Sequence, residues 1–414
     1  MITRDTVHKI LDIKESYQMP DKLMELLQSE ESKEKIFDEF MEIEQDLSYD
    51  WFTDYFQDEQ GDRKQLKQDF TPDCICTIVN GIIDNSDEVA DICAGTGGLT
   101  IKRWQQDKSS YFYCEEVSSR TIPILLFNMA IRNATGCIVH GDSLKNKVEA
   151  VYYLWRGNKY SSIEKSKAPP VMKFKAVIMN PPYSLTWDGE VSEDDARFEG
   201  YAMPPKSKAD YAFVLHGLHM LEEGGTLVAV LPHGVLFRGN AEEEIRKRLV
   251  QKKYIDGIIG LPDKLFLNTG IPVLLLVIKK CIHEDICIID ASKEYIKGSK
   301  QNSMSEDNIK TVLSAYNLRR SIDKMSSIVK SQEVEENGYN LNIPRYVDTF
   351  EAEPVPDIQD IIAEMIETEK EIARCETELL HVMQNELVGT TEQAQKELEK
   401  AVRLYQGYMQ EKRK

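Results

Sequence analysis

The stretch EVADICAGTGGLT (residues 88–100) decides the fold, because an apolar strand ends there in a glycine-rich turn and a helix follows. Glycines at such a turn let the backbone approach a ligand, and N–H groups at the start of the helix can bind an anionic group. Gly95, Gly97 and Gly98 give G-x-G-G, whereas a dinucleotide site requires G-x-G-x-x-G. Thr100 stands at the position of the third glycine, which counts against a pyrophosphate ligand. The turn alone is also compatible with a simple tight connection.

Short apolar runs rich in valine and isoleucine alternate with helical stretches from about residue 66 to residue 290. The helical stretches include residues 120–133, 210–222 and 241–251. The alternation predicts an α/β fold with a doubly wound, mainly parallel sheet covered on both faces. Ligands of such sheets bind at the carboxyl ends of the strands. The apolar runs are 89–93, 111–114, 137–140, 174–179, 226–231, 255–261, 273–278 and 286–289.

Acidic residues follow the second and third of these runs. Glu115 and Glu116 come about twenty residues after the glycine-rich turn, where an acid can accept hydrogen bonds from both ribose hydroxyls. Asp142 follows the third run and can accept a hydrogen bond from an adenine amino group. Each acid alone is equally typical of a helix cap or a surface charge. Together with the turn, they favour a nucleoside site.

The fourth strand runs directly into the stiff turn of FKAVIMNPPYSLTW (residues 174–187). Two prolines without backbone N–H groups cannot continue a strand. The Asn180 side chain and the Pro181 carbonyl then offer two acceptors for an –NH2 group, and Tyr183 offers a flat face for stacking a base or other planar amide. Accepting both hydrogens favours the pyramidal, nucleophilic geometry of the amine and stabilises developing positive charge. The alternative is an N-P-P-Y turn without chemistry.

Helical patterns flank this α/β region on both sides. Residues 1–65 predict a short N-terminal helical region, because apolar residues recur at three- and four-residue spacing. Beyond Pro356 an apolar stripe predicts a long helix, Gly389 breaks it, and a capping box of Thr390 with Gln393 predicts a second helix at 391–409. The predicted divisions are therefore 1–65, 66–350 and 351–414. The striped helices pack either on their own domain or on a partner's helices.

The bulk composition is that of an ordinary water-soluble protein, with 42% hydrophobic and 29% charged residues. No apolar run approaches the roughly 20 residues of a membrane span. The N-terminal sequence lacks the apolar core of a secretion signal. The eight cysteines form no C-x-x-C pair, which favours reduced thiols in a cytoplasm over a zinc or disulfide framework.

The net charge of −19 is unlike that of a typical nucleic-acid binder. Residues 1–60 hold 17 acidic and 6 basic residues, so more than half of the excess lies in the first seventh of the chain. A polyanion would have to meet the basic clusters around residues 165–175 and 238–253, or be held partly by another protein. Taken alone, each cluster is more typical of a solvated surface.

Several motifs, in order along the chain, resemble one family. DICAGTGG followed by NPPY resembles the S-adenosylmethionine-dependent amino-methyltransferases, in the motif order of the DNA adenine-N6 group. KQDFTP, at residues 67–72, resembles the motif that contacts the methionine end of the cofactor. The resemblance to the modification subunit of type I restriction-modification systems covers about residues 66–350. It is carried by ADYAFVLHGLHML, VAVLPHGVLFRGNAEEEIRKRLV, GIIGLPDKLFLNTGIPVLLLVIKK and YNLNIPRYVDTF.

The resemblance implies a Rossmann-like methyltransferase that methylates adenine in double-stranded DNA. It implies that a separate specificity subunit reads the sequence and is gripped by the C-terminal helices, and it leaves a restriction subunit open as a further partner. No metal is implied. The helical region ahead of QDFTP is shorter than the family's N-terminal domain, which puts DNA holding and the sensing of methylation state in doubt for this chain.

The resemblance also implies roles for individual residues. The catalytic turn is Asn180, Pro181, Pro182 and Tyr183, and the pocket for the extruded base includes Phe266 and Asn268. Glu116 is preferred to Glu115 for the ribose, because the family's acidic-then-aliphatic pattern aligns with Glu116 and Val117. The S-adenosylmethionine site comprises Phe70, Thr71, Pro72, Asp91, Ala94, Gly95, Thr96, Gly97, Glu116, Asp142 and Ser143.

Two other readings stay open from the residues. One is a methyltransferase acting on another planar amine or amide, such as an RNA adenine or a protein glutamine, because N-P-P-Y serves those substrates too. The other is a non-catalytic assembly subunit. The intact glycine turn and N-P-P-Y turn count against the second reading.

Overall fold

The computed structural model describes residues 2–52, 70–83, 86–191, 195–267, 270–349 and 357–412. It divides into two compact units, Met1–Thr349 and Phe350–Lys414, each of which is described by itself. Among the described residues, no helix is both long enough and apolar enough to cross a bilayer.

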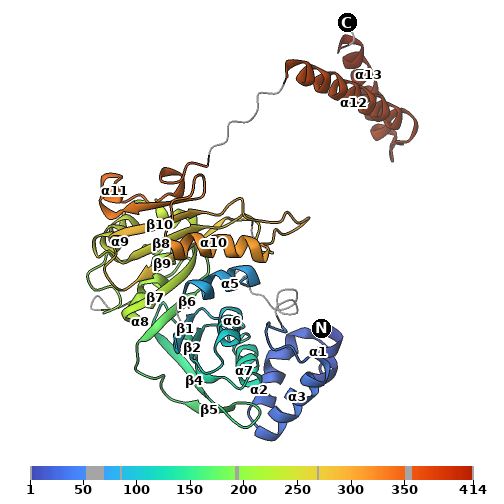
Figure 1. The fold of residues 1–414 in the computed structure, drawn as a ribbon. Helices are drawn as coiled ribbons and strands as arrows, with labels where there is room; N and C mark the ends of the chain where they lie inside the picture. Colours follow the sequence, from blue (N-terminus) through green and yellow to red (C-terminus); the bar gives the residue numbers. More distant parts are fainter. Residues whose placement is uncertain are drawn as a thin grey trace. The chain divides into compact units, whose positions relative to one another are not determined.

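The first unit is built on one sheet, which has eleven strands within the described ranges (Figure 1). Its strand order is β11-β10-β8-β9-β7-β6-β1-β2-β3-β4-β5. The strands are β1 (Glu88–Ile92), β2 (Tyr111–Glu116), β3 (Thr135–Asp142), β4 (Lys147–Trp155), β5 (Ser162–Ser166), β6 (Phe174–Met179), β7 (Leu221–Pro232), β8 (Ile255–Gly260), β9 (Val273–Lys279), β10 (Asp285–Asp290) and β11 (Ser326–Lys330).

The centre of the sheet, β7-β6-β1-β2-β3, is parallel throughout. The chain adds β2 and β3 on one side of β1 and later adds β6 and β7 on the other, so the strand order reverses at β1. This confirms the predicted doubly wound α/β fold. The flanks add antiparallel pairs, because a short connection after β3 turns the chain directly back into β4, and β9 inserts between β7 and β8.

Helices cover both faces of the sheet because its central strands are apolar on both sides. In β6, Ala176 and Ile178 pack into one core while Val177 and Met179 pack into the other. The first core takes helices α5 (Asp73–Ile82), α6 (Gly98–Gln106), α7 (Ile122–Ile131) and α10 (Glu306–Leu318). The second takes α8 (Asp210–Met220), α9 (Ala241–Gln251) and α11 (Ser331–Glu336). The described part of the unit also contains three 3-10 turns, at Ser16–Gln18, His233–Leu236 and Ile343–Arg345.

The N-terminal helices form a further layer over α7. They are α1 (Arg4–Leu11), α2 (Met19–Leu27) and α3 (Glu30–Ile43), whereas residues 53–65 of the predicted helical region lie outside the described residues. Phe127 of α7 lies at the centre of this contact, with its ring centroid 4.9 Å from that of Phe37 and 5.0 Å from that of Phe40. Edge-to-face contacts of this kind add to the burial of the rings themselves.

The second unit consists of α12 (Ile358–Asn385) and α13 (Glu392–Lys412). Lys412 Nζ lies 2.7 Å from Glu376 Oε1 and links the two helices. The predicted cap at Thr390 is wrong by one residue, since Ala394 N donates to Thr391 Oγ1 at 3.1 Å. The predicted apolar stripe of α12 is largely exposed, with Met365 62% and Ile362 50% accessible.

The aromatic contact over α7 gives a stability prediction. Phe127 is fully buried, so Phe127→Ala removes a large apolar side chain and leaves a cavity. We expect it to lower the free energy of unfolding by about 3–5 kcal/mol. The matched control is Phe237→Ala, whose side chain is 48% exposed and should change stability by about 1 kcal/mol or less. Urea unfolding followed by circular dichroism measures both, and equal midpoints for the two variants would contradict the packing described.

Candidate active site

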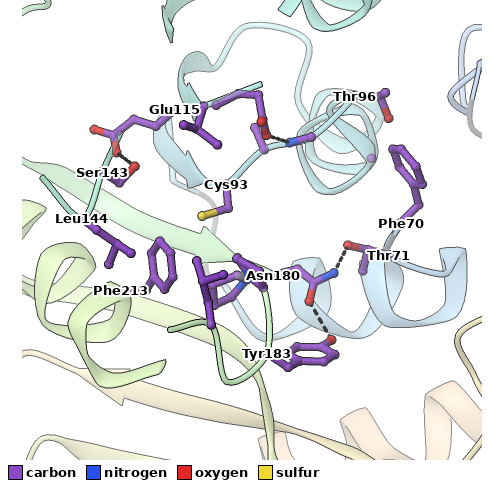
Figure 2. Close-up of a pocket in the computed structure, with 18 of the residues that line it drawn as sticks. Phe70, Thr71, Cys93, Thr96, Glu115, Ser143, Leu144, Asn180, Tyr183 and Phe213 are labelled. Atoms are coloured by element: carbon purple, nitrogen blue, oxygen red, sulfur yellow. Dashed lines mark hydrogen bonds between the residues drawn. The ribbon is translucent and has the colours of Figure 1, made fainter. Parts of the chain in front are cut away.

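A cavity of about 180 Å³ opens at the carboxyl ends of β1, β2, β3 and β6, where the strand order reverses. Figure 2 shows side chains from these strand ends, from the segment before α5 and from α8 around one space. The cavity is lined by Phe70, Thr71, Cys93, Ala94, Gly95, Thr96, Gly98, Glu115, Glu116, Val117, Asp142, Ser143, Leu144, Asn180, Pro181, Pro182, Tyr183, Leu185 and Phe213.

The Asn180 side chain is held at both ends of its amide. Its Nδ2 donates to Thr71 Oγ1 at 2.9 Å, and Tyr183 OH donates to its Oδ1 at 2.7 Å (Figure 2). The amide is thus held between two hydroxyl groups, with its nitrogen toward Thr71 and its oxygen toward Tyr183. A carbonyl oxygen has two lone pairs, so Oδ1 can accept a second hydrogen bond from a ligand while Tyr183 stays in place.

Two aromatic rings meet beside this turn. The Tyr183 and Phe266 centroids are 5.9 Å apart with perpendicular planes, and the Phe266 side chain is buried. Phe266 is therefore in contact with the N-P-P-Y turn, although it does not line the cavity itself. Asn268, which was predicted beside it, lies outside the described residues.

The glycine-rich turn adopts left-handed backbone conformations, with φ of 58° at Gly95 and 97° at Gly97. A Cβ at Gly97 would also lie 2.9 Å from the Leu125 side chain. Gly95 N donates to Glu116 Oε2 at 2.9 Å, so the turn is bonded to the end of the neighbouring strand. The backbone conformation at both positions strongly favours glycine.

Thr100 has a specific role at the position of the missing third glycine. Its hydroxyl donates to Asp91 Oδ2 at 2.6 Å and ties the first turn of α6 to the end of β1. Asp91 Oδ1 has no hydrogen-bond partner in the described part of the chain. Burial raises the pKa of Asp91 to about 7, although the Thr100 hydrogen bond opposes that shift. Asp91 therefore stabilises the start of α6 through Thr100 and does not line the cavity.

Glu115 and Glu116 have different surroundings. Glu115 receives hydrogen bonds from His216 Nε2 at 2.9 Å, Ser143 Oγ at 2.5 Å and Tyr113 OH at 2.9 Å. Burial opposes its ionisation, but these partners, His216 foremost, lower its pKa to about 2.

Glu116 bonds to backbone N–H groups instead, those of Gly95 and Ser118. Burial raises the pKa of Glu116, and those two hydrogen bonds oppose the rise. The Glu116 side chain therefore contacts the glycine-rich turn, whereas the Glu115 carboxylate accepts hydrogen bonds from other side chains.

At the end of β3, Asp142 Oδ1 accepts from Leu144 N at 2.9 Å and from Lys145 N at 3.2 Å. These bonds orient the Asp142 carboxylate at the cavity wall, next to Ser143. Acidic acceptors thus lie at the ends of two successive strands, β2 and β3, at the positions that the sequence predicts.

The structure brings most predicted site residues together. Of the described ones, only Pro72, Asp91, Gly97 and Phe266 do not line the cavity, and Pro72 caps the start of α5. Residues that line it without having been predicted are Cys93, Gly98, Glu115, Val117, Leu144, Leu185 and Phe213. Phe213 lies on α8, within a motif that carried the family resemblance, but its helical spacing gave no signal of cavity contact. Within the described ranges, no cluster of side chains is suited to hold a metal ion.

Asp50 is a further residue that the sequence did not indicate. It accepts hydrogen bonds from the Thr96 hydroxyl and, at 2.8 Å, from Asn128 Nδ2. Asn128 Nδ2 also donates to the Thr96 carbonyl at 2.9 Å. Arg132 donates to the Leu47 and Tyr49 carbonyls and so holds the segment that carries Asp50. The glycine-rich turn is therefore anchored to the N-terminal region.

Comparisons with known proteins identify the family of this chain. Residues 44–354 match the family model described as N-6 DNA Methylase. The type I restriction enzyme MpnII methylase subunit of Mycoplasma pneumoniae is 30% identical over 376 residues, covering 85% of this chain and 66% of that protein. The MjaVII methylase subunit of Methanocaldococcus jannaschii, also of a type I restriction enzyme, is 30% identical over 382 residues, covering 86% of this chain and 60% of that protein.

A solved structure is similar as well. The type I restriction-modification system methyltransferase subunit from Streptococcus thermophilus has a TM-score of 0.60 and 36% identity, covering 68% of this chain and 59% of that chain. This chain thus spans between 59% and 66% of the lengths of the three relatives.

The raised pKa of Asp91 predicts a pH-dependent effect on stability. Between pH 4 and 7 the unfolded chain ionises this carboxyl while the folded chain keeps the proton, so Asp91 lowers stability progressively as the pH rises through that range. An asparagine side chain at this position cannot ionise. We therefore expect the stability of Asp91→Asn, relative to the parent, to increase by about 2.5 kcal/mol between pH 5 and pH 8. Urea unfolding at both pH values measures this, and a constant difference between the two proteins would contradict it.

Proposed function

Because the chain belongs to the N-6 DNA methylase family and is related to the methylase subunits of type I restriction enzymes, we propose that it methylates the N6 amino group of adenine in double-stranded DNA. The donor would be S-adenosylmethionine. The observation that carries the proposal is the position of the Asn180 amide at the cavity wall, where it is held between the Thr71 and Tyr183 hydroxyls.

The cavity residues fit the proposed cofactor. Glu116 lies against the glycine-rich turn, as an acceptor for ribose hydroxyls would, and Asp142 lies at the next strand end, where it can accept from an adenine amino group. Phe70 and Thr71 line the cavity beside Asn180 and would meet the amino-acid end. When bound, S-adenosylmethionine supplies an electrophilic methyl group.

The target amine would be held by Asn180 Oδ1 and the Pro181 carbonyl. The lone pair of an exocyclic amine is delocalised into the ring, so the amine is a poor nucleophile. Two acceptors on its hydrogens favour a pyramidal nitrogen and stabilise the positive charge that develops during transfer. No base has to act first, because the methylated amine becomes acidic and loses its proton afterwards.

The adenine must leave the duplex to reach this position, since its amino group is inaccessible within the stack. Tyr183 would stack on the extruded base, and Phe266 would support the Tyr183 ring from the side. Their perpendicular contact limits the orientations open to Tyr183.

We also propose the partners that the relatives suggest. A specificity subunit would read the DNA sequence and bind the exposed apolar stripe of α12 and α13. Whether a restriction subunit joins is left to experiment. Exposed side chains such as Met365 and Ile362 are the kind that a partner's helices would cover.

The proposal predicts distinct effects at Asn180 and Tyr183. Asn180→Ala removes one of the two acceptors and should reduce methyl transfer at least about 100-fold, with cofactor affinity nearly unchanged. Tyr183→Phe keeps the stacking ring and serves as the matched control for Tyr183→Ala. We expect the phenylalanine variant to retain much more activity than the alanine variant.

The measurement uses the full chain co-expressed with a specificity subunit, and modified adenines are mapped by single-molecule sequencing. Calorimetry with S-adenosylmethionine checks the cofactor site separately. A near-parental rate for Asn180→Ala would sink the catalytic assignment. Methyl transfer to RNA or protein in place of DNA would favour the alternative substrates, and failure to bind S-adenosylmethionine would favour a non-catalytic subunit.

A further inference from the structure

A hairpin between β10 and α10 lies against the loop that carries Phe266. We call residues 293–303 the lysine hairpin. Ile296 and Ser303 pair across it, with N···O distances of 2.7 and 3.1 Å. Asn302 N donates to the Lys264 carbonyl at 2.8 Å, and Gln301 Nε2 donates to the Leu265 carbonyl at 2.7 Å. The hairpin is therefore fixed to the residues just before Phe266.

These contacts connect the lysine hairpin to the proposed base pocket through the segment that carries Phe266. Gln301 bonds to the backbone next to Phe266, and the Phe266 ring contacts Tyr183. Lys300 is the chain neighbour of Gln301, and Lys297 lies across the turn from it. The two lysines are thus linked to the N-P-P-Y turn through hydrogen bonds to the backbone before Phe266 and one aromatic contact.

The basic and acidic side chains of this region differ in the partners that they have. Lys264, Lys297 and Lys300 are exposed, and none of them has an ion pair within the described parts of the chain. The neighbouring acids accept hydrogen bonds from neutral groups: Asp263 from Asn302 Nδ2, and Glu294 from Asn308 Nδ2. The acids therefore hold the base of the hairpin, and the cations are left at the surface.

Exposed apolar side chains accompany these lysines. Ile296 is 55% exposed on the hairpin, and Leu267 is 45% exposed next to Phe266. Such a combination suits a nucleic-acid strand, whose phosphates attract cations and whose bases and sugars offer apolar faces.

We propose that the lysine hairpin, together with Lys264, binds the DNA phosphates that flank the extruded adenine; this inference rests on the proposed function. A base that leaves the stack turns about its own backbone, so the adjacent phosphates come to the mouth of the pocket. A chain with a net charge of −19 repels DNA at long range, and cations close to the extruded base would offset that repulsion.

The test compares two pairs of substitutions in the full chain. Lys297→Gln with Lys300→Gln removes two charges from the lysine hairpin. Lys108→Gln with Lys330→Gln is the matched control, since these lysines are also exposed and have no ion pair within the described residues, and they lie just before β2 and at the end of β11, by the edge of the sheet opposite the cavity. The probe is a fluorescent duplex with one unpaired adenine, titrated between about 50 and about 200 mM salt.

We expect the hairpin variant to bind the probe about tenfold more weakly at low salt. Each lost phosphate contact reduces the slope of log K against log salt by about 0.9, so the slope should fall by about 1.8. The control should change the slope by less than about 0.5. Calorimetry should give the same affinity for S-adenosylmethionine in all three proteins.

Equal binding by the hairpin variant and the control would overturn the proposal, as would an absence of salt-dependent binding by the parent. Failure of the proposed function is recognised separately. If the hairpin variant loses DNA affinity but no methylated adenine is found with a specificity subunit present, the hairpin assignment stands and the methyl-transfer assignment falls. If methylation occurs and the hairpin variant binds DNA like the parent, the methyl-transfer assignment stands and the hairpin assignment falls.

Discussion

The hydrogen bond from Asn180 Nδ2 to Thr71 Oγ1 is the interaction on which the site depends. It joins residues 109 positions apart in the chain, one at the end of β6 and the other just before α5. It holds in place an amide whose two ends are nearly equal in shape but opposite in hydrogen-bonding character. The rest of the first unit places these two segments within reach, because β6 lies beside β1 in the sheet and α5 packs on the same core.

Much of the fold could be predicted from the sequence, because fully buried parallel strands are continuous apolar runs. All eight predicted runs correspond to strands. The strands that were missed, β4, β5 and β11, lie in the antiparallel flanks and carry many exposed residues. KVEAVYYLW of β4 is polar in its first half, so the apolar pattern gives little sign of a nine-residue strand. Pairing with neighbouring strands, and not their own composition, makes these three segments form strands.

The site was predictable where a functional side chain lies directly at a strand end, as at Glu116, Asp142 and Asn180. It was not predictable where the contact crosses the chain. Nothing local to Asp50 indicates that it meets Thr96, 46 residues away. His216 likewise meets Glu115 across 101 residues, and this contact separates the roles of two adjacent glutamates that the sequence could distinguish only by resemblance.

The anchoring of Thr96 by Asp50 has a practical consequence for shortened versions of the protein. Cutting the chain back to the sheet and its own helices would remove the acceptor of the Thr96 hydroxyl and one of the two acceptors of the Asn128 amide. The loss of such hydrogen bonds destabilises a fold by about 1 kcal/mol each. The same cut would uncover the aromatic face of α7. The smallest fragment worth expressing therefore retains α1, α2 and α3, although they lie outside the strand order that defines the fold.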